Sequence, residues 1–237
     1  MHFKMKKDLN QKLINLIEYY NLINANILFS KKPVKRINAK NTTNFFSGNK
    51  NQKLKKLKEN IANIKNCSLK KSATNVVFAD GNPNAKIMLI GEGPGAQEDA
   101  QGIPFVGRAG KLLDKMLQAI QLDRTKVYIS NVVNYRPPEN RKPTDEEIKR
   151  YFPYLTSHIE IIKPKILILL GSTALNTIIG NEEVISKARG RWSQKEIGTA
   201  KPWIIATFHP AFLMRQPEQK KLSWIDLKMV RQKLKTL

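Results

Sequence analysis

From Lys86 onward the chain alternates short apolar runs with longer segments of helical spacing. The apolar runs are KIMLI (86–90), VYISNVV (127–133), KILILL (165–170) and WIIATF (203–208). They lack the alternation of polar and apolar residues of a half-exposed sheet, which is typical of parallel strands buried on both faces. Helices are predicted where apolar residues recur at helical spacing, over 109–121, 144–162, 172–179 and 223–237. This order predicts an α/β fold, a three-layer α/β/α sandwich around a four-stranded parallel sheet.

The N-terminal part has a different pattern. Residues 6–28 carry apolar side chains at helical spacing, among them Leu9, Leu13 and Leu16, so they predict a helix. Residues 29–52 are rich in Lys, Asn, Ser and Thr, which is typical of a flexible basic linker or of a solvated spacer. Helical spacing returns over 54–66. We therefore predict a basic helical extension with a linker over 1–55 and the main domain over 56–237.

The charge and the cysteine content narrow the class of protein. The chain has 42 Lys and Arg residues against 19 Asp and Glu, a formal net charge of +23. Such an excess favours a polyanion or a membrane surface as partner, although a general lysine bias is the alternative. The single cysteine, Cys67, excludes an intrachain disulfide and a site of four cysteines. No run approaches the roughly 20 apolar residues of a membrane span, and the N-terminus is too polar for a secretory signal. We expect a cytoplasmic protein that does not bind membranes.

Polar residues and tight turns follow each of the four predicted strands. The segments are GEGPG (91–95), NVVNYRPPENRKPT (131–144), GSTA (171–174) and HPAFLMR (209–215). Ligands of open parallel sheets bind beyond the carboxyl ends of the strands, so these segments predict one shared site. The glycine-rich turn is neither a phosphate loop, because no Gly-Lys-Ser/Thr follows, nor a GxGxxG motif.

Taken together, these motifs resemble the family 4 uracil-DNA glycosylases. The resemblance runs in order from Cys67 to Arg215 and includes GEGPG, PFVGRAG, NVV with RPP, and HPAFLMR. It implies a monofunctional hydrolase of base excision repair that cleaves the bond between uracil and deoxyribose and leaves an abasic site. The implied partner is uracil-containing DNA, single- or double-stranded, and the expected state is a monomer. A base inside a duplex must be flipped into a pocket before such a reaction.

The resemblance implies roles around the uracil for Glu92, Gly93, Phe105, Asn131 and His209. The phenylalanine would stack on the base, and the asparagine amide, with one acceptor and two donors, would read O4 and N3–H. The histidine would donate to O2, where charge develops, and the glutamate would orient the attacking water. The glycine would let the nucleotide approach the backbone. The alternatives are structural: a core phenylalanine, a loop-capping asparagine, a satisfied histidine and a glutamate bonded to backbone N–H groups.

Five further residues are assigned to DNA binding. Gly171 and Ser172 open a predicted helix, whose N-terminus favours a phosphate. Phe212, Leu213 and Met214 follow the histidine on a loop, and one of them, Leu213 before the other two, would wedge into the space that the flipped base leaves. Arg215 and Arg136 would contact phosphates. Each basic residue alone is also explained by a solvated surface.

The sequence departs from the family at the iron–sulfur cluster. The family typically holds a 4Fe–4S cluster through four cysteines. Here Ile64, Tyr135 and Tyr151 stand at three of these positions, and only Cys67 is kept. One thiolate cannot hold such a cluster, so we predict no cofactor and no metal. As a hypothesis, Tyr135 and Tyr151 fill the volume that the cluster would occupy.

Two alternatives to an active enzyme stay open. The missing cysteines, and Ala211 where the family usually has a serine, favour a catalytically inactive DNA-binding repair accessory protein. A small-molecule nucleotide-binding protein would explain the strand-end loops but not the charge of +23.

Overall fold

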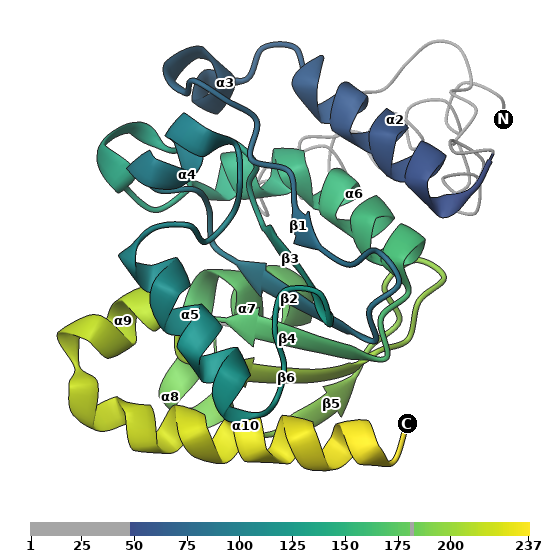
Figure 1. The fold of residues 1–237 in the computed structure, drawn as a ribbon. Coiled ribbons are helices and arrows are strands. Elements are labelled where there is room, and N and C mark those ends of the chain that lie inside the picture. Colours follow the sequence, from purple (N-terminus) through teal and green to yellow (C-terminus); the bar gives the residue numbers. More distant parts are fainter. Residues whose placement is uncertain (1–47, 181–182) are drawn as a thin grey trace, which may run out of the picture. The chain divides into compact units, whose positions relative to one another are not determined.

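The computed structural model describes residues 48–180 and 183–237, which form an α/β fold around one sheet (Figure 1). The sheet has six strands in the order β1-β3-β2-β4-β6-β5. Their bounds are β1 Asp80–Gly81, β2 Ile87–Gly91, β3 Val127–Asn131, β4 Ile166–Leu170, β5 Trp192–Gln194 and β6 Trp203–Thr207. Strands β3, β2, β4 and β6 are parallel, whereas β1 and β5 pair antiparallel at the two edges. The predicted parallel sheet is confirmed, and two short edge strands extend it.

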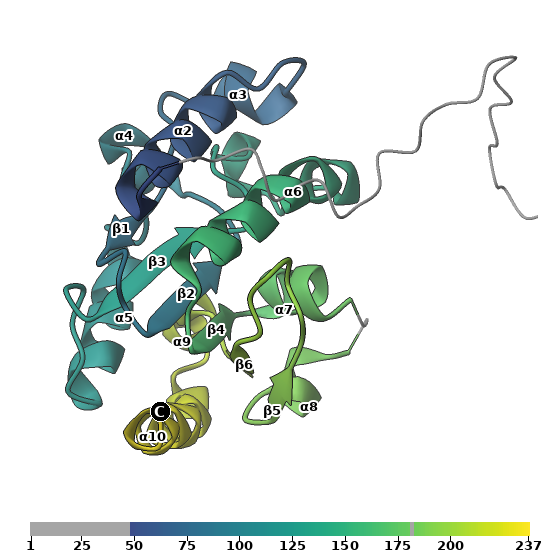
Figure 2. The same ribbon diagram turned by 90° about the vertical axis from the view of Figure 1, so that its right-hand side faces the viewer.

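The helices lie on both faces of this sheet (Figure 2). Their bounds are α2 Lys50–Ala62, α3 Ser68–Ser72, α4 Ala96–Gln101, α5 Arg108–Ala119, α6 Asp145–Ile162, α7 Ser172–Ile179, α8 Ile185–Ala188, α9 Pro210–Arg215 and α10 Lys220–Lys235, with 3₁₀ turns η2 Pro138–Asn140 and η3 Pro217–Gln219. None of the helices in the described part of the chain is long and apolar enough to cross a lipid bilayer.

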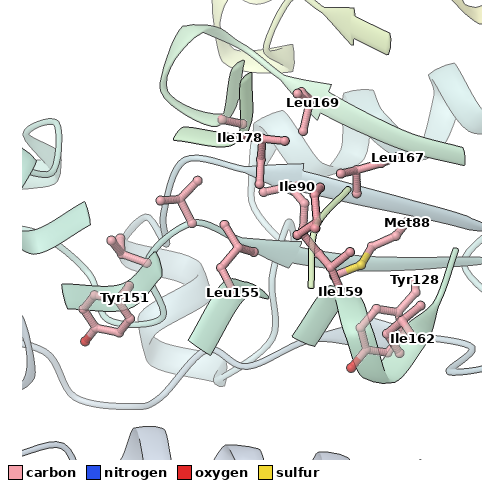
Figure 3. Packing of buried hydrophobic residues seen from close by; sticks show 14 of the residues in the cluster. Met88, Ile90, Tyr128, Tyr151, Leu155, Ile159, Ile162, Leu167, Leu169 and Ile178 are labelled. Atoms are coloured by element: carbon pink, nitrogen blue, oxygen red, sulfur yellow. The ribbon is translucent and has the colours of Figure 1, made fainter. Parts of the chain in front are cut away.

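Two hydrophobic clusters fill the space between the sheet and its two helical layers. Successive side chains of a strand point to opposite faces. In β2, Met88 and Ile90 therefore join the cluster under α2, α6 and α7, whereas Ile87 and Leu89 join the cluster under α5, α9 and α10. Figure 3 shows the first cluster, in which strand side chains meet side chains of α6. All five residues of each central parallel strand except Trp203 are buried, which explains why the apolar runs lack polar alternation.

A histidine without a predicted role is buried in the first layer. The ring of His158, on α6, stacks on Phe78 at 4.5 Å between centroids, and its Nε2 lies 2.8 Å from the hydroxyl oxygen of Tyr128. Burial lowers the pKa of His158 to about 3, so the ring is neutral at physiological pH. The hydroxyl contact thus fastens α6 to β3, and the aromatic stack fastens it to the segment just before β1.

The predicted N-terminal extension falls mostly outside the described residues, including the predicted helix over 6–28 and most of the linker. Helix α2 begins at Lys50, within the predicted linker, because Asn49 and Gln52 form a capping box. Leu54, Leu57 and Ile61 of α2 are buried in the first cluster. The predicted boundary between residues 55 and 56 lies inside α2 and stays a prediction.

Candidate active site

The loops after β2, β3 and β6 enclose a cavity of about 180 Å³ at the carboxyl edge of the sheet. All five residues that the resemblance assigns to the uracil line it: Glu92, Gly93, Phe105, Asn131 and His209. The other lining residues are Pro94, Gly95, Glu98, Ala109, Pro137, Asn140, Arg141 and Ala211. The fold therefore brings together side chains from segments that lie more than a hundred residues apart.

The last residue of β2 must be a glycine because two site residues pack on it. Gly91 is the register partner of Asn131 on the neighbouring strand β3. A Cβ atom on Gly91 would lie 2.4 Å from Asn131 Oδ1 and 2.5 Å from Phe105 Cζ. The missing side chain thus sets the amide and the aromatic ring close together at the floor of the cavity.

Phe105 is held in a conformation that few residues adopt. Its φ is +55°, in the left-handed region, and its side chain is 5% exposed. Gly110, at the start of α5, allows this turn, since a Cβ there would lie 1.7 Å from the Phe105 carbonyl oxygen. Glu98 adds a tie between two loops by accepting from the backbone N–H groups of Gly95 (3.1 Å) and Gly107 (2.8 Å).

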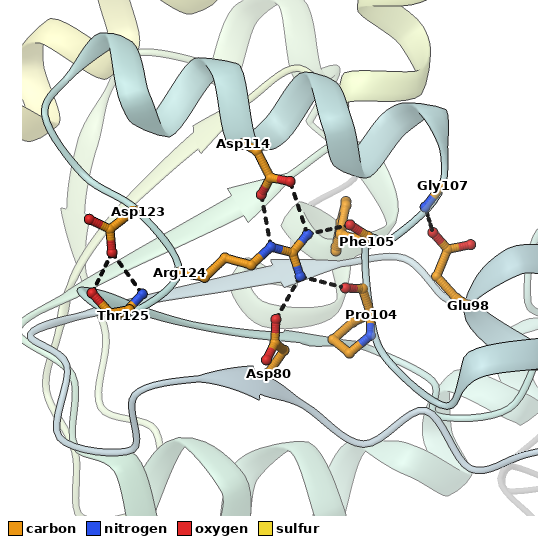
Figure 4. Close-up of polar contacts among 9 residues, drawn as sticks. All are labelled: Asp80, Glu98, Pro104, Phe105, Gly107, Asp114, Asp123, Arg124 and Thr125. Carbon is orange, nitrogen blue, oxygen red and sulfur yellow. Dashed lines mark hydrogen bonds and ion pairs between the residues drawn. The ribbon is translucent and has the colours of Figure 1, made fainter.

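Arg124, just before β3, binds the turn that contains Phe105 (Figure 4). Its guanidinium donates to the carbonyl oxygens of Pro104 (3.1 Å) and Phe105. It is itself held by Asp80 at 2.6 Å and Asp114 at 2.8 Å. The guanidinium therefore links β1, α5 and the turn of the aromatic ring. No motif in the sequence marks this role.

Asn131 carries an unsatisfied acceptor. Its side chain is 3% exposed, and its Oδ1 has no hydrogen-bond partner among the described residues. A buried acceptor without a partner costs free energy, so its presence at a cavity favours a ligand that donates to it. The imide N3–H of uracil is such a donor.

His209 presents a donor to the cavity. Its Nδ1 accepts from the backbone N–H of Ala211 at 3.2 Å, so the proton of the neutral ring sits on Nε2. Burial, together with the charge of Arg215, lowers the pKa of His209 to about 4. The ring centroid lies 5.6 Å from that of Phe105. The imidazole is thus a neutral N–H donor beside the ring of Phe105.

Glu92 is oriented by a residue that sequence reasoning missed. The hydroxyl of Thr173, in the first turn of α7, donates to Glu92 Oε2 at 2.5 Å. The hydroxyl of Thr177 in turn donates to the Thr173 carbonyl oxygen at 2.7 Å. The GSTA segment predicts only a phosphate site at a helix N-terminus, whereas its threonine orients the carboxylate at the cavity.

A groove of about 500 Å³ adjoins the cavity and shares Glu92, Gly93, Asn140, His209 and Ala211 with it. It is further lined by Lys142, Leu170, Gly171, Ser172, Ile185, Phe208, Phe212 and Arg215. Three of the residues that the resemblance assigns to DNA binding thus lie together beside the cavity: Gly171, Ser172 and Arg215.

The other basic side chains near the cavity, on the loop after β3, are partly paired within the protein. Arg136 lines neither space, and its Nε donates to Asn140 Oδ1 at 2.8 Å. Arg141 lines the cavity but donates to both carboxylate oxygens of Glu147, at 2.7 and 2.8 Å. This guanidinium holds the pKa of Glu147 down at about 2. Lys142 is the exposed cation of this loop that lines the groove.

Leu213 does not lie where the sequence places it. The segment after His209 is helix α9 rather than a loop, and Leu213 is 1% exposed within the cluster under α5 and α10. The helix forms because Pro210 occupies its first position and His209 caps it. A leucine packed in this core is not available as a wedge in this structure. Its neighbour Phe212 is the residue of α9 whose ring lines the groove.

The four positions at which the family places cluster ligands lie in one hydrophobic cluster. Ile64, Cys67, Tyr135 and Tyr151 are all buried there, with 8%, 4%, 5% and 0% exposure. The sulfur of Cys67 lies 3.2 Å from the hydroxyl oxygen of Tyr151. A 4Fe–4S cluster needs four such ligands, and this donor set of one thiol, two phenols and an alkyl group does not fit it.

Comparison with known proteins agrees with the site. The sequence model of the Uracil DNA glycosylase superfamily matches residues 78–228. The chain is 41% identical over 187 residues to the Type-4 uracil-DNA glycosylase of Sulfurisphaera tokodaii, covering 76% of this chain and 84% of that protein. It is 44% identical over 161 residues to the Thermotoga maritima protein of the same name (66% and 81% covered). For the Archaeoglobus fulgidus protein of that name, the identity is 39% over 174 residues (72% and 87%). The chain belongs to the uracil-DNA glycosylase superfamily and resembles its type 4 members over most of its length.

Proposed function

We propose that the protein is a monofunctional uracil-DNA glycosylase, which hydrolyses the N-glycosidic bond of deoxyuridine in DNA. The observation that carries this proposal is the buried Oδ1 of Asn131, which has no hydrogen-bond partner in the described part of the chain and shares a cavity with the rings of Phe105 and His209. The relatives named above, called uracil-DNA glycosylases, support the same substrate.

The geometry supports one division of labour. Phe105 stacks on the flipped uracil, and Asn131 accepts from N3–H while its NH₂ group donates to O4. Cytosine presents the reverse pattern at N3 and N4, so the same amide rejects it. Both contacts need the base outside the helix stack.

Bond cleavage then uses His209 and Glu92. As the bond from C1′ to N1 breaks, its electron pair moves onto uracil, and His209 Nε2–H donates to O2 where charge develops. This donor is the neutral imidazole, because the lowered pKa of His209 keeps the ring unprotonated at physiological pH. Glu92, oriented by Thr173, accepts a proton from the water whose oxygen bonds to C1′. Its negative charge also stabilises the cationic sugar.

We also propose that the enzyme works without an iron–sulfur cluster. The donor set at the four family positions supports this, since it contains one thiol. Stoichiometric iron and acid-labile sulfide in the purified protein would contradict the proposal. The monomeric state and the cytoplasmic location stay predictions.

The test is release of uracil from a labelled oligonucleotide with a single uracil, in the presence of a chelator. His209→Ala and Asn131→Ala should each reduce release by orders of magnitude. Asn176→Ala, at an exposed asparagine of α7, is the matched control and should act like the parent. Salt-dependent DNA binding without any release would instead favour a catalytically inactive accessory protein.

A further inference from the structure

The groove beside the uracil cavity combines an apolar floor with positive charge. Leu170, Ile185, Phe208 and Phe212 supply apolar surface, while the exposed side chains of Lys142 and Arg215 add two cations. Its volume of about 500 Å³ exceeds the 180 Å³ of the uracil cavity. An aromatic surface inside a basic groove is the arrangement that binds unpaired nucleotides.

The ring of Phe212 packs against a buried ring that is itself supported by charged side chains. Phe212 is half-buried, and its ring centroid lies 4.9 Å from that of Phe208, which is 4% exposed. The guanidinium of Arg189 lies 5.8 Å from the Phe208 ring centroid. Arg189 is in turn paired with the buried carboxylate of Asp226. A ring backed in this way keeps its orientation when a ligand arrives, which lowers the entropy cost of stacking.

The groove continues directly from the uracil cavity. The two spaces share Glu92, Gly93 and His209, so the same DNA strand can pass from one to the other. The groove contains neither Phe105 nor Asn131, so it lacks the uracil-reading groups. Its occupant is therefore the next part of the strand rather than the flipped uracil.

We infer that Phe212 forms a second nucleotide subsite, on which the base adjacent to the uracil on the same strand stacks. Lys142 and Arg215 lie beside this subsite and bind the strand's phosphates. The inference rests on the proposed glycosylase function and deepens it. Stacking is sequence-tolerant because every base has an aromatic face, so any of the four bases fits.

This subsite favours single-stranded DNA. The adjacent base reaches Phe212 only when it is unpaired. In a duplex this requires opening a second base pair, which adds to the cost of flipping the uracil itself. Uracil in a single strand should therefore be released faster than uracil in a matched duplex.

The experiment combines protein and substrate changes. The substrates are single-stranded oligonucleotides with one uracil, with natural neighbours or with a stable abasic residue on its 5′ or its 3′ side, and the natural sequence is also used as a matched duplex. The proteins are the parent, Phe212→Ala, Phe212→Leu and Phe212→Tyr. Phe152→Ala is the matched control, because Phe152 is a 40% exposed phenylalanine of α6 that lines neither space. The measurement is kcat/KM for uracil release, with thermal unfolding of each variant alongside.

The expected result is that the loss from changing Phe212 and the loss from removing the adjacent base do not add. Removing the base on one side should lower kcat/KM of the parent about tenfold, the range of one base–aromatic stack. Phe212→Ala and Phe212→Leu should show a similar loss on natural DNA and no further loss with the abasic neighbour. Phe212→Tyr and Phe152→Ala should behave like the parent. Phe212→Leu keeps the apolar bulk of α9, so it remains informative if the alanine variant unfolds.

Three outcomes separate the possible failures. Losses that multiply would show that the ring and the adjacent base act independently, which overturns the subsite. Loss by Phe212→Ala on duplex DNA alone would make the ring a wedge for the gap left by the flipped base, which also overturns it. If the parent released uracil from none of the oligonucleotides, the proposed function itself would fail.

Discussion

Replacing Arg124 with glutamine tests whether this residue holds the stacking ring of Phe105 in place. Its guanidinium donates to the Pro104 and Phe105 carbonyl oxygens and pairs with Asp80 and Asp114. Glutamine is too short to reach all four partners. We expect Phe105, with its φ of +55°, to relax away from the cavity once its carbonyl loses this donor.

The magnitude follows from the exposure of the partners. The side chains of Asp80 and Asp114 are 33% and 46% exposed, so water replaces the guanidinium and each ion pair contributes at most about 1 kcal/mol. The carbonyl contacts add about 1 kcal/mol. Arg124→Gln should therefore lower the free energy of unfolding by about 2 to 3 kcal/mol. A misplaced ring forfeits part of the roughly 1 to 3 kcal/mol of base stacking, which lowers kcat/KM about tenfold.

A double-mutant cycle separates positioning from general destabilisation. Uracil release is measured for the parent, Arg124→Gln, Phe105→Ala and the double variant, at a temperature where all four are folded. If Arg124 acts through Phe105, its replacement costs little once the ring is absent. Arg124→Lys, which keeps the charge but not the fork of donors, should recover only part of the activity. An equal loss from Arg124→Gln in both backgrounds would refute the positioning role.

Three further predictions concern other contacts. Thr173→Val removes the hydroxyl that donates to Glu92 and should lower kcat about tenfold with little change in KM, measured by steady-state uracil release. An unchanged kcat would show that the Thr173 hydroxyl does not act on the reaction through Glu92. Tyr151→Ala should cost about 3 to 5 kcal/mol in urea unfolding because its side chain is fully buried. Tyr151→Phe, which loses only the contact with Cys67, should cost less than about 1 kcal/mol, and unchanged stability in the alanine variant would refute the volume-filling hypothesis. Because the pKa of His158 is lowered in the folded state, the unfolded chain binds a proton at a higher pH than the folded chain does. The contribution of His158 to the free energy of unfolding is therefore fully present above pH 6.5 and is lost as the pH falls toward 3. Between pH 7 and pH 5 His158 should contribute a loss of about 2 kcal/mol in urea unfolding, separate from the loss due to the lowered pKa of His209, and His158→Leu should abolish the His158 part of the slope.

The sequence predicts those parts of the fold that bury complete strands. The four central strands were found because both faces are covered, which leaves apolar runs without alternation. The edge strands β1 and β5 were missed because two and three residues carry no periodic signal. The sequence predicts a loop in place of helix α9 because the helix has six residues and its cap is a ring nitrogen of His209 rather than a Ser, Thr, Asp or Asn side chain.

The site residues also fall into a group that the sequence predicts and a group that it does not. Residues that sit at strand ends inside recognisable motifs, such as Asn131 and His209, were identified and lie together in one cavity. Thr173 and Arg124 were not, because each acts through a contact with a residue distant in sequence. Leu213 was misplaced because its exposure depends on how α9 packs against α5, which the motif does not record.

The contact between His209 Nδ1 and the backbone N–H of Ala211 gives this histidine a second role. The ring whose Nε2 faces the cavity also caps α9, the short helix that carries Phe212 and Arg215. An alanine at this position therefore removes the proposed N–H donor and the cap of a neighbouring helix together, so the loss of activity overstates the contribution of the donor alone. Serine, whose hydroxyl oxygen caps a helix but which carries no N–H donor, separates the two roles.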